Sequence, residues 1–213
     1  MLRSKRLFSP LVIFARDVTF HTINPESAYD RLLLGQAWKW TQRRKRLYCD
    51  TGGEMTLPEY LDDAERPERK DIWVDGDGEC LLTIELHVAD EYTIHVTAPR
   101  NTSFQFVLTA LLNIRRELFE RLHATRILTS CGVYGGHENK GSRAMAEACG
   151  MTATGNGWDD ETRDGTPVYW REYAITREQY YGRSENNQHE RLRILSEADV
   201  ARAARLSSVA TGA

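Results

Sequence analysis

Residues 139–151 read Asn139-Lys-Gly-Ser-Arg-Ala-Met-Ala-Glu-Ala-Cys-Gly150-Met151, which is the pattern of a short capped helix. Asn139 is a preferred N-cap residue, and Gly150 is a preferred residue just beyond a helix C-terminus. The apolar run from Arg126 to Cys131, just before this helix, predicts a strand. Two further strands follow the helix, with a polar hairpin loop between them. The C-terminal part of the chain is therefore predicted as strand, loop, short helix and hairpin.

The preceding residues alternate between strand and helix signals. Asn24-Pro25-Glu26 has the order of an N-cap, a first helical residue and an acidic first turn. We expect one helix from there to about Gly35 and a second from Gln36 to about Arg46. Apolar residues on one face between Phe104 and Leu122 predict a long amphipathic helix, capped by Thr102 or Ser103. The expected strands are 11–18, 71–74, 80–86, 92–97, 126–131, 151–154 and 166–176, the expected hairpin turn is 75–78, and the expected loops are 50–70, 132–138 and 158–165.

These elements indicate an α/β (α+β) fold with a mostly antiparallel sheet and one long helix after the fourth strand. Residues 1–181 are expected to form a single domain, because 213 residues suffice for one mid-sized domain with a tail. Residues 182–190 are polar, and Ser196-Glu-Ala-Asp199 is a capping box that opens a small helix over 197–206. Residues 182–213 are therefore interpreted as a polar linker, a C-terminal helix and a tail.

The composition is that of an ordinary globular domain. Hydrophobic residues make up 41%, charged residues 28%, and the formal net charge is −3, which gives no whole-chain argument for nucleic acid. No apolar run approaches the roughly 20 residues of a membrane span, and the basic N-terminus lacks a signal-peptide core. A cytoplasmic protein is therefore expected. The cysteines have no zinc spacing, so buried free thiols and no metal site are predicted for Cys49, Cys80, Cys131 and Cys149.

The C-terminal pattern, together with a strand that carries Ile94-His95-Val96, resembles the GNAT (GCN5-related) N-acetyltransferases. The shared order is this strand, the long helix, a strand, an Asn, a small-residue helix ending in Gly150-Met151, and a hairpin ending in Tyr169–Tyr173. The resemblance covers about residues 70–176 and is closest to phage- and prophage-encoded GNAT-like proteins. It implies a mixed, mostly antiparallel central sheet with flanking helices. It also implies acetyl-CoA as co-substrate and direct attack of an amine on the thioester.

Binding of acetyl-CoA is the first property that the resemblance implies. In the family, a glycine-rich loop before the long helix turns its backbone N–H groups toward the pyrophosphate. Here residues 98–103 contain no glycine, so Arg100 would supply charge and the N–H groups of residues 102–104 would face the anion. Asn139 and Ser142 would hold the pantetheine amide or a phosphate, unless they only cap the next helix. The expected cofactor-binding residues are Val96, Ala98, Arg100, Asn101, Thr102, Ser103, Asn139, Ser142 and Arg143.

The resemblance also implies a catalytic base. His95 lies where a GNAT general base or substrate contact is found, and an imidazole accepts a proton near neutral pH. The alternative is a hydrogen-bonded histidine of the sheet. The family tyrosine that protonates the leaving thiolate falls at Ala146 here, so Tyr134 or His137 in the preceding loop is the expected substitute. Glu85 would be a second base, although a solvated strand face fits it better.

Two functions remain open at this point. The first is an N-acyltransferase whose acceptor is a small amine, a protein amine or a modified nucleobase; it is favoured because His95 and the 139–151 segment are in place. The second is a catalytically inactive GNAT fold that serves as a structural or interaction protein, such as a phage virion or internal head component. The protein would then lie in the virion rather than in the host cytoplasm. The glycine-free loop and Ala146 favour this second function.

Partners follow from the same resemblance. A homodimer and, in the second function, phage structural proteins are compatible with it. The segment Trp38–Tyr48 interleaves aromatic and basic residues, which suits contact with nucleic acid. A helix that buries its tryptophans and solvates its basic face explains the same pattern and is favoured.

Overall fold

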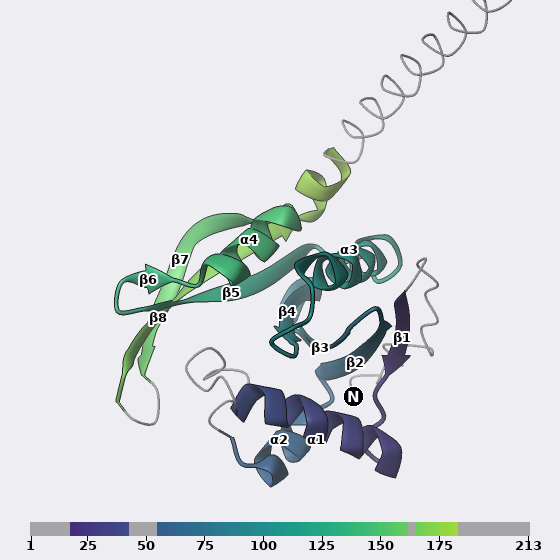
Figure 1. Cartoon of the computed structure of the whole chain (residues 1–213). Coiled ribbons are helices and arrows are strands. Elements are labelled where there is room, and N and C mark those ends of the chain that lie inside the picture. The colour runs from purple at the N-terminus through teal and green to yellow at the C-terminus, as the bar shows by residue number, and fades with distance from the viewer. Residues whose placement is uncertain (1–17, 43–54, 162–164, 183–213) are drawn as a thin grey trace, which may run out of the picture. The chain divides into compact units, whose positions relative to one another are not determined.

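The computed structural model describes residues 18–42, 55–161 and 165–182, whose strands form one eight-stranded sheet (Figure 1). The helices are α1 (Ala28–Gln42), α2 (Leu57–Ala64), α3 (Phe104–Glu120) and α4 (Lys140–Ala148). The strands are β1 (Val18–Thr22), β2 (Arg69–Gly76), β3 (Glu79–Leu86), β4 (Glu91–Thr97), β5 (Arg126–Tyr134), β6 (His137–Glu138), β7 (Thr152–Glu161) and β8 (Pro167–Thr176).

The strand order is β1-β2-β3-β4-β5-β8-β7, and β6 pairs with β5. The pairs β1/β2, β2/β3, β3/β4, β5/β6 and β7/β8 are antiparallel. The pair β4/β5 in the middle of the sheet is parallel, because α3 carries the chain back to the start of the next strand. The predicted fold class, a mixed and mostly antiparallel sheet with flanking helices, is thus confirmed.

Helices α1 and α2 cover one face of β2 and β3. The buried cluster between them comprises Ile23, Leu34, Ala37, Trp40, Tyr60, Ala64, Trp73 and Leu81. The rings of Trp40 and Trp73 lie 5.2 Å apart, and the indole N–H of Trp38 donates to the Met55 carbonyl at 2.9 Å. Trp73 and Leu81 are cross-strand partners, so their side chains define the face of the sheet that α1 covers.

The other face of the sheet lies under α3. Side chains alternate along a strand, so the neighbours of Trp73 and Leu81 point away from α1. Those neighbours are buried and apolar, and buried apolar residues of α3 cover them. They include Ile72, Val74, Leu82 and Ile84 of the strands and Phe106, Ala110, Leu111, Ile114 and Leu118 of the helix. In Figure 1, α1 and α2 lie on one side of β2–β4 and α3 on the other.

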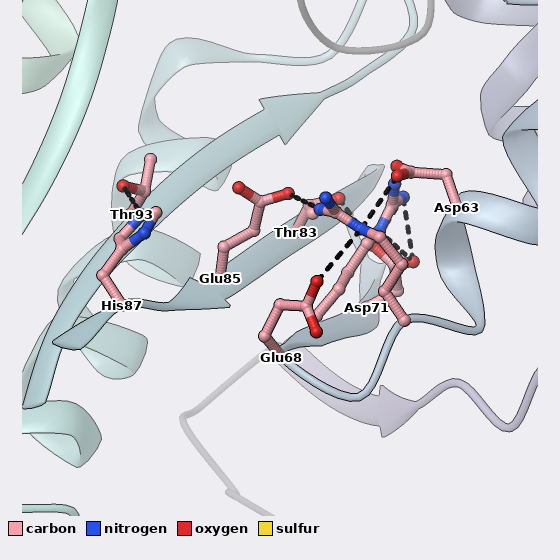
Figure 2. Close-up of polar contacts among 9 residues, drawn as sticks. Asp63, Glu68, Asp71, Thr83, Glu85, His87 and Thr93 are labelled. Carbon is pink, nitrogen blue, oxygen red and sulfur yellow. Dashed lines mark hydrogen bonds and ion pairs between the residues drawn. The ribbon is translucent and has the colours of Figure 1, made fainter.

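A buried ion pair ties α2 to β2 and β3 (Figure 2). Arg69 is 5% and Asp71 3% exposed. The guanidinium donates to both carboxylate oxygens, from Nε at 3.0 Å and from Nη2 at 3.1 Å. Asp63 of α2 pairs with Arg69, and the Thr83 hydroxyl donates to Asp71 at 2.5 Å. The Arg69 guanidinium also lies over the ring of Tyr60, so both buried charges have partners on several sides.

The structure differs from the sequence prediction between residues 24 and 70. One helix, α1, replaces the two helices expected on either side of Gly35. Leu34 and Ala37 flank this glycine and are fully buried, and their packing outweighs the cost of glycine in a helix. Residues 57–64 form α2 rather than part of a loop. The Thr56 N–H and hydroxyl both donate to the Glu59 carboxylate, and proline lies in the first turn, so the sequence did carry a start signal.

Strand lengths in the C-terminal part also differ. The loop expected over 132–138 is wrong in part, because β5 continues to Tyr134 and turns back to pair with β6. The hairpin loop expected over 158–165 is likewise too long, because β7 continues to Glu161 opposite β8. In both cases the partner strand supplies the backbone hydrogen bonds that extend the strand. The capping predictions at Ser103 and Asn139 are confirmed, and Cys80, Cys131 and Cys149 are buried free thiols as expected.

Several predictions fall outside the described residues. They concern the strand before Val18, the 43–48 part of the basic segment, Cys49, and the linker and C-terminal helix within 183–213. The described residues fall into two compact units, one up to Ile175 and one that begins at Thr176. In the part of the chain that the structure describes, no helix is both long and apolar enough to cross a membrane.

Candidate active site

Strands β4 and β5 pair over three residues only and then separate. Glu91, Tyr92 and Thr93 lie opposite residues 126–128. At the next position a side chain replaces the backbone donor, because the Thr129 hydroxyl donates to the Ile94 carbonyl at 2.9 Å. Both strands continue beyond this point, β4 to Thr97 and β5 to Tyr134, without pairing with each other. A gap thus opens between two parallel strands in the middle of the sheet.

A cavity of about 360 Å³ lies at this gap. Its walls come from β4 and the loop after it, from α3, from β5, from α4 and from β8. One wall is formed by residues of β4 and of the loop after it, namely Ile94, His95, Val96, Ala98, Arg100 and Thr102. Opposite them stand Ser130, Asn139, Ser142, Ala146, Cys149 and Trp170.

Backbone groups of β4 face the gap. The Ile94 carbonyl points toward β5, since it accepts the hydrogen bond from Thr129. The N–H and C=O of one strand residue point to the same side, and successive residues point to opposite sides. Val96 therefore turns its N–H and C=O toward the gap, whereas His95 turns its own toward β3. An N–H in this position can polarise a carbonyl group held in the cavity.

His95, Ser130 and Trp170 share the face of the sheet that α1 covers. Glu91, Arg126 and Glu172 of three adjacent strands are joined by ion pairs of 3.8 and 2.8 Å, which places all three on one face. His95, Ser130 and Trp170 are an even number of residues away on the same strands, so they point to that face too. On β4 this parity also includes Thr97, the partner of Leu81. An imidazole and a hydroxyl thus stand on opposite edges of the gap.

The N-termini of α3 and α4 lie at the same cavity. The Ser103 hydroxyl accepts from the Phe106 N–H at 3.1 Å, and Asn139 Oδ1 accepts from the N–H groups of Gly141 and Ser142 at 3.1 and 3.2 Å. Phe104, Gly141 and Ser142 line the cavity. Helix N-termini carry partial positive charge, so two of them, with Arg100 nearby, favour an anion at this end of the cavity.

The structure brings most of the predicted site residues together. His95, Val96, Ala98, Arg100, Thr102, Asn139 and Ser142 all line the cavity. Asn139 also caps α4, so its alternative role as a helix cap is realised. One detail was wrong: the Thr102 N–H donates to the Pro99 carbonyl at 3.2 Å, because residues 99–102 form a turn, so this N–H is already engaged.

Among the described side chains, the other predicted residues do not line this cavity. Ser103 caps α3, and Asn101 is exposed in the loop before it. His137 is exposed on β6, where its backbone pairs with that of Tyr134, whose side chain lies outside the described part of the structure. The Arg143 Nε donates to Glu147 at 2.9 Å along the exposed side of α4. Glu85 lies on β3 and pairs with Arg66, so it is part of the ion-pair cluster of Figure 2 rather than of the cavity.

Cys149 has a potentially nucleophilic side chain, but its burial disfavours the reactive thiolate. Its side chain lines the cavity, but burial raises the pKa of the thiol to about 11. Burial likewise raises the pKa of the Cys131 thiol, on β5, to about 12. The thiolate is the nucleophilic form of cysteine, so a thiol with such a pKa is almost fully protonated at neutral pH. The cavity is thus lined by an imidazole and a hydroxyl, and the described cysteine that lines it carries a protonated thiol.

Sequence reasoning missed the half of the cavity that β5, β8 and the interior side of α4 contribute. Ser130 lies in a strand whose register against β4 no local pattern reveals. Trp170 has the sequence signature of a core residue and is indeed only 3% exposed. Ala146 was noted only as the replacement of the family tyrosine, and the space that its small side chain leaves in the cavity was not considered. No group of three or more His, Cys, Asp or Glu side chains suited to a metal occurs among residues 18–42, 55–161 and 165–182.

No protein-family model and no curated protein matches this sequence. Solved structures match its fold. A GCN5-related N-acetyltransferase from Brucella melitensis superposes with a TM-score of 0.62 at 16% identity, over 81% of each chain. A mutant of the spermidine N-acetyltransferase SpeG from Vibrio cholerae gives 0.60 at 13% identity, over 80% of this chain and 99% of that one. The microcin self-immunity acetyltransferase MccE, in complex with acetyl-CoA and AMP, gives 0.58 at 15% identity, over 76% and 93%. The fold of this chain is the GNAT N-acetyltransferase fold.

Proposed function

We propose that this chain is an N-acyltransferase that moves an acyl group, first of all acetyl, from its CoA thioester to an amine. The observation that carries the proposal is the cavity at the β4–β5 gap. It brings a backbone N–H, an imidazole and the N-termini of two helices to one space. The fold supports the same proposal, because the solved structures it matches include several acetyltransferases, one of them with acetyl-CoA bound.

In this proposal the two ends of the cavity hold different parts of the thioester. The pyrophosphate lies at the N-termini of α3 and α4, where Arg100 adds a full positive charge to their partial charges. Asn139 and Ser142 contact the pantetheine arm. The thioester carbonyl reaches the gap, where the Val96 N–H stabilises the negative charge that develops on its oxygen.

The amine then attacks from the face that carries His95. Its nitrogen lone pair forms a bond to the thioester carbon, and the carbon–sulfur bond breaks as the carbonyl reforms. His95 accepts the proton that the nitrogen loses, which is the role of a general base. The hydroxyl of Ser130 on the opposite edge of the gap helps to orient the amine.

The leaving thiolate needs no tyrosine in this scheme. A thiol of ordinary pKa, about 8.5, leaves readily as the thiolate near neutral pH and takes its proton from water afterwards. Ala146, in place of the family tyrosine, is therefore compatible with turnover. Tyr134 and His137 stay predictions as alternative acids.

Calorimetric titration of the protein with acetyl-CoA tests the proposal. Binding should be measurable, and a concentration 100 times the dissociation constant should raise the free energy of unfolding by about 2.7 kcal/mol. Ala146→Phe should fill the cavity beside α4 and abolish binding without unfolding the protein. Arg100→Ala should weaken it, and Arg31→Ala on α1 removes the same charge from an exposed ion pair and is the matched control. No binding of acetyl-CoA or CoA to the folded protein at millimolar concentration would reject the proposal.

A second candidate function is an inactive GNAT fold used as a structural or interaction protein, including the phage-type proteins that the sequence resembles. The observation that favours it is the loop 98–103, which has no glycine and in which the Thr102 N–H is engaged by Pro99. In that case the protein would bind neither CoA nor amines, and it would be recovered with virion proteins instead of in the cytoplasm. A homodimer is compatible with either function, and sedimentation of the purified protein measures it directly.

A further inference from the structure

The wall of the cavity formed by Trp170 continues into an exposed aromatic surface on the β7–β8 hairpin. Trp170 and Trp158 are cross-strand partners whose rings lie 6.5 Å apart and are nearly parallel, at 30°. Trp170 is 3% exposed, but Trp158 is 46% exposed. A tryptophan has a large apolar surface to bury. Left open beside a cavity, it forms a floor on which the rest of a ligand can lie.

Asp160 adds a fixed negative charge to this floor. It lies two residues after Trp158 and therefore on the same face of the hairpin. Its Oδ2 accepts from the Trp170 indole N–H at 3.3 Å, and its Oδ1 accepts from the Glu161 N–H at 2.9 Å. The carboxylate is thus held beside the stacked rings by bonds that leave its charge in place.

This face of the hairpin is also the face from which the amine acceptor approaches. Trp170 shares its parity with His95 and Ser130, as the ion pairs of Arg126 with Glu91 and Glu172 establish. A ligand whose reacting nitrogen lies between His95 and Ser130 can therefore extend along this face. Its chain would pass Trp170 and reach Trp158 and Asp160. Two strand residues separate the level of Trp158 from that of Asp160, a span of about 7 Å.

We propose that Trp170, Trp158 and Asp160 form an acceptor subsite for the distal cation of an aliphatic amine. The inference rests on the proposed acyltransferase function and names its acceptor class: an amine that carries a second positive charge at the far end of a chain. Indole faces attract cations, and a carboxylate adds Coulomb attraction. An anionic group at the same place would be repelled, and a neutral one would gain only apolar contact.

Three probes with six carbon atoms and the same reacting amine separate these cases: 1,6-diaminohexane, hexylamine and 6-aminohexanoate. Each is titrated calorimetrically into protein saturated with CoA, and into protein without CoA. The diamine should bind about tenfold tighter than hexylamine, which corresponds to about 1.4 kcal/mol, and 6-aminohexanoate should bind weakest. Raising the salt concentration should reduce the advantage of the diamine, because partly exposed charges are screened.

Asp160→Asn is the decisive variant, and Asp159→Asn is its matched control. Asparagine at 160 keeps an oxygen for the Trp170 N–H but removes the charge. Asp159 lies opposite Tyr169 on the other face of the hairpin, so the same change there alters the net charge equally. Asp160→Asn should reduce the preference for the diamine to within twofold of hexylamine. Asp159→Asn should leave it unchanged, and Trp158→Ala should weaken the diamine more than hexylamine.

Each failure is distinguishable. Equal binding of the three probes, equal effects of the two asparagine variants, or no amine binding to protein that does bind CoA would each overturn the subsite alone. Absence of CoA binding would reject the proposed function itself. Thermal unfolding of each variant, with its CoA affinity, shows whether the hairpin has kept its structure. If Trp158 and Trp170 serve only as a stabilising cross-strand pair, amine binding will not depend on the distal charge. That result would contradict the proposal.

Discussion

Asp71, Thr83 and His95 stand side by side on three neighbouring strands, on the same face of the sheet. At one end of this row, Asp71 is buried against Arg69, Thr83 and the α2 carboxylate of Asp63 (Figure 2). At the other end, His95 faces a cavity. The first end satisfies its polar groups with other parts of the protein, and the second presents polar groups to the cavity.

The two ends differ because the strands are fully paired around Asp71 but separate beside His95. Strands β2 and β3 are paired on both sides and covered on both faces, so a buried charge in them must find its partner within the fold. Strands β4 and β5 separate after Thr93 and Leu128, so the groups beyond those residues have no partner strand across the gap. A polar side chain becomes available for chemistry where pairing stops, not where polar residues are most frequent.

The largest effect should follow from breaking the closed end of the row. Arg69→Met leaves the buried carboxylate of Asp71 without its counter-ion and should lower the free energy of unfolding by about 3–5 kcal/mol, measured by urea denaturation. Arg66→Met is the matched control, since Arg66 pairs with Asp63, Glu68 and Glu85 at 41% side-chain exposure and should cost about 0–1 kcal/mol. Similar losses for both variants would contradict the distinction between buried and exposed pairs.

The open end of the row should respond in activity instead of stability. His95→Gln should reduce kcat/KM for acyl transfer by about 10²–10⁴-fold while leaving the unfolding midpoint and CoA affinity unchanged. His87→Gln makes the same change outside the cavity, where His87 contacts Thr93 at 2.7 Å, and should leave activity intact. If His95→Gln destabilises the protein but leaves the activity per folded molecule unchanged, His95 is a structural histidine of the sheet.

The two helix caps allow a finer comparison, because only one of them lines the cavity. Ser103→Ala and Asn139→Ala should each destabilise the protein by about 1 kcal/mol through the loss of a cap. Only Asn139→Ala should also weaken CoA binding, by up to about tenfold for one lost hydrogen bond. Titration calorimetry and denaturation on the same preparations measure both quantities. Equal losses of affinity would mean that the caps act through helix position alone.

The smallest effect is expected at Cys149. Because burial raises the pKa of its thiol to about 11, the thiol stays protonated at neutral pH and supplies no thiolate nucleophile. Cys149→Ala should therefore keep acyl transfer, and its pH–rate profile should follow that of the unchanged protein between pH 6 and 9. Alkylation of Cys149 by a thiol reagent should be slow over the same range and speed up only as the pH approaches the thiol pKa. A loss of activity in Cys149→Ala with unchanged CoA binding would point to an acyl-thiol intermediate.

The sequence predicted the elements that carry local signals. Period-2 alternation found β4, the apolar face from Phe104 onward found α3, and Asn139 with Gly150 bounded α4. Where a signal was read too simply, the prediction failed: Thr56 and Glu59 announced α2, and Gly35 did not end α1. The first error overlooked a local capping signal. The second has a tertiary cause, since burial of Leu34 and Ala37 outweighs local propensity.

The sequence by itself determined which residue types are available at the candidate site: His95, Arg100, the asparagine cap, and no glycine in the loop before α3. Only the tertiary structure decided where they meet. The parallel register of β4 and β5, three residues long, sets the point where the gap opens and places Ser130 opposite His95. The antiparallel pairing of β7 with β8 brings Trp158 and Asp160 to Trp170. The register of β4 against β5 depends on partners far apart in the chain, and for that reason no local pattern contains it. The register of the β7–β8 hairpin depends on where its loop begins and ends, and the loop expected from the sequence was too long.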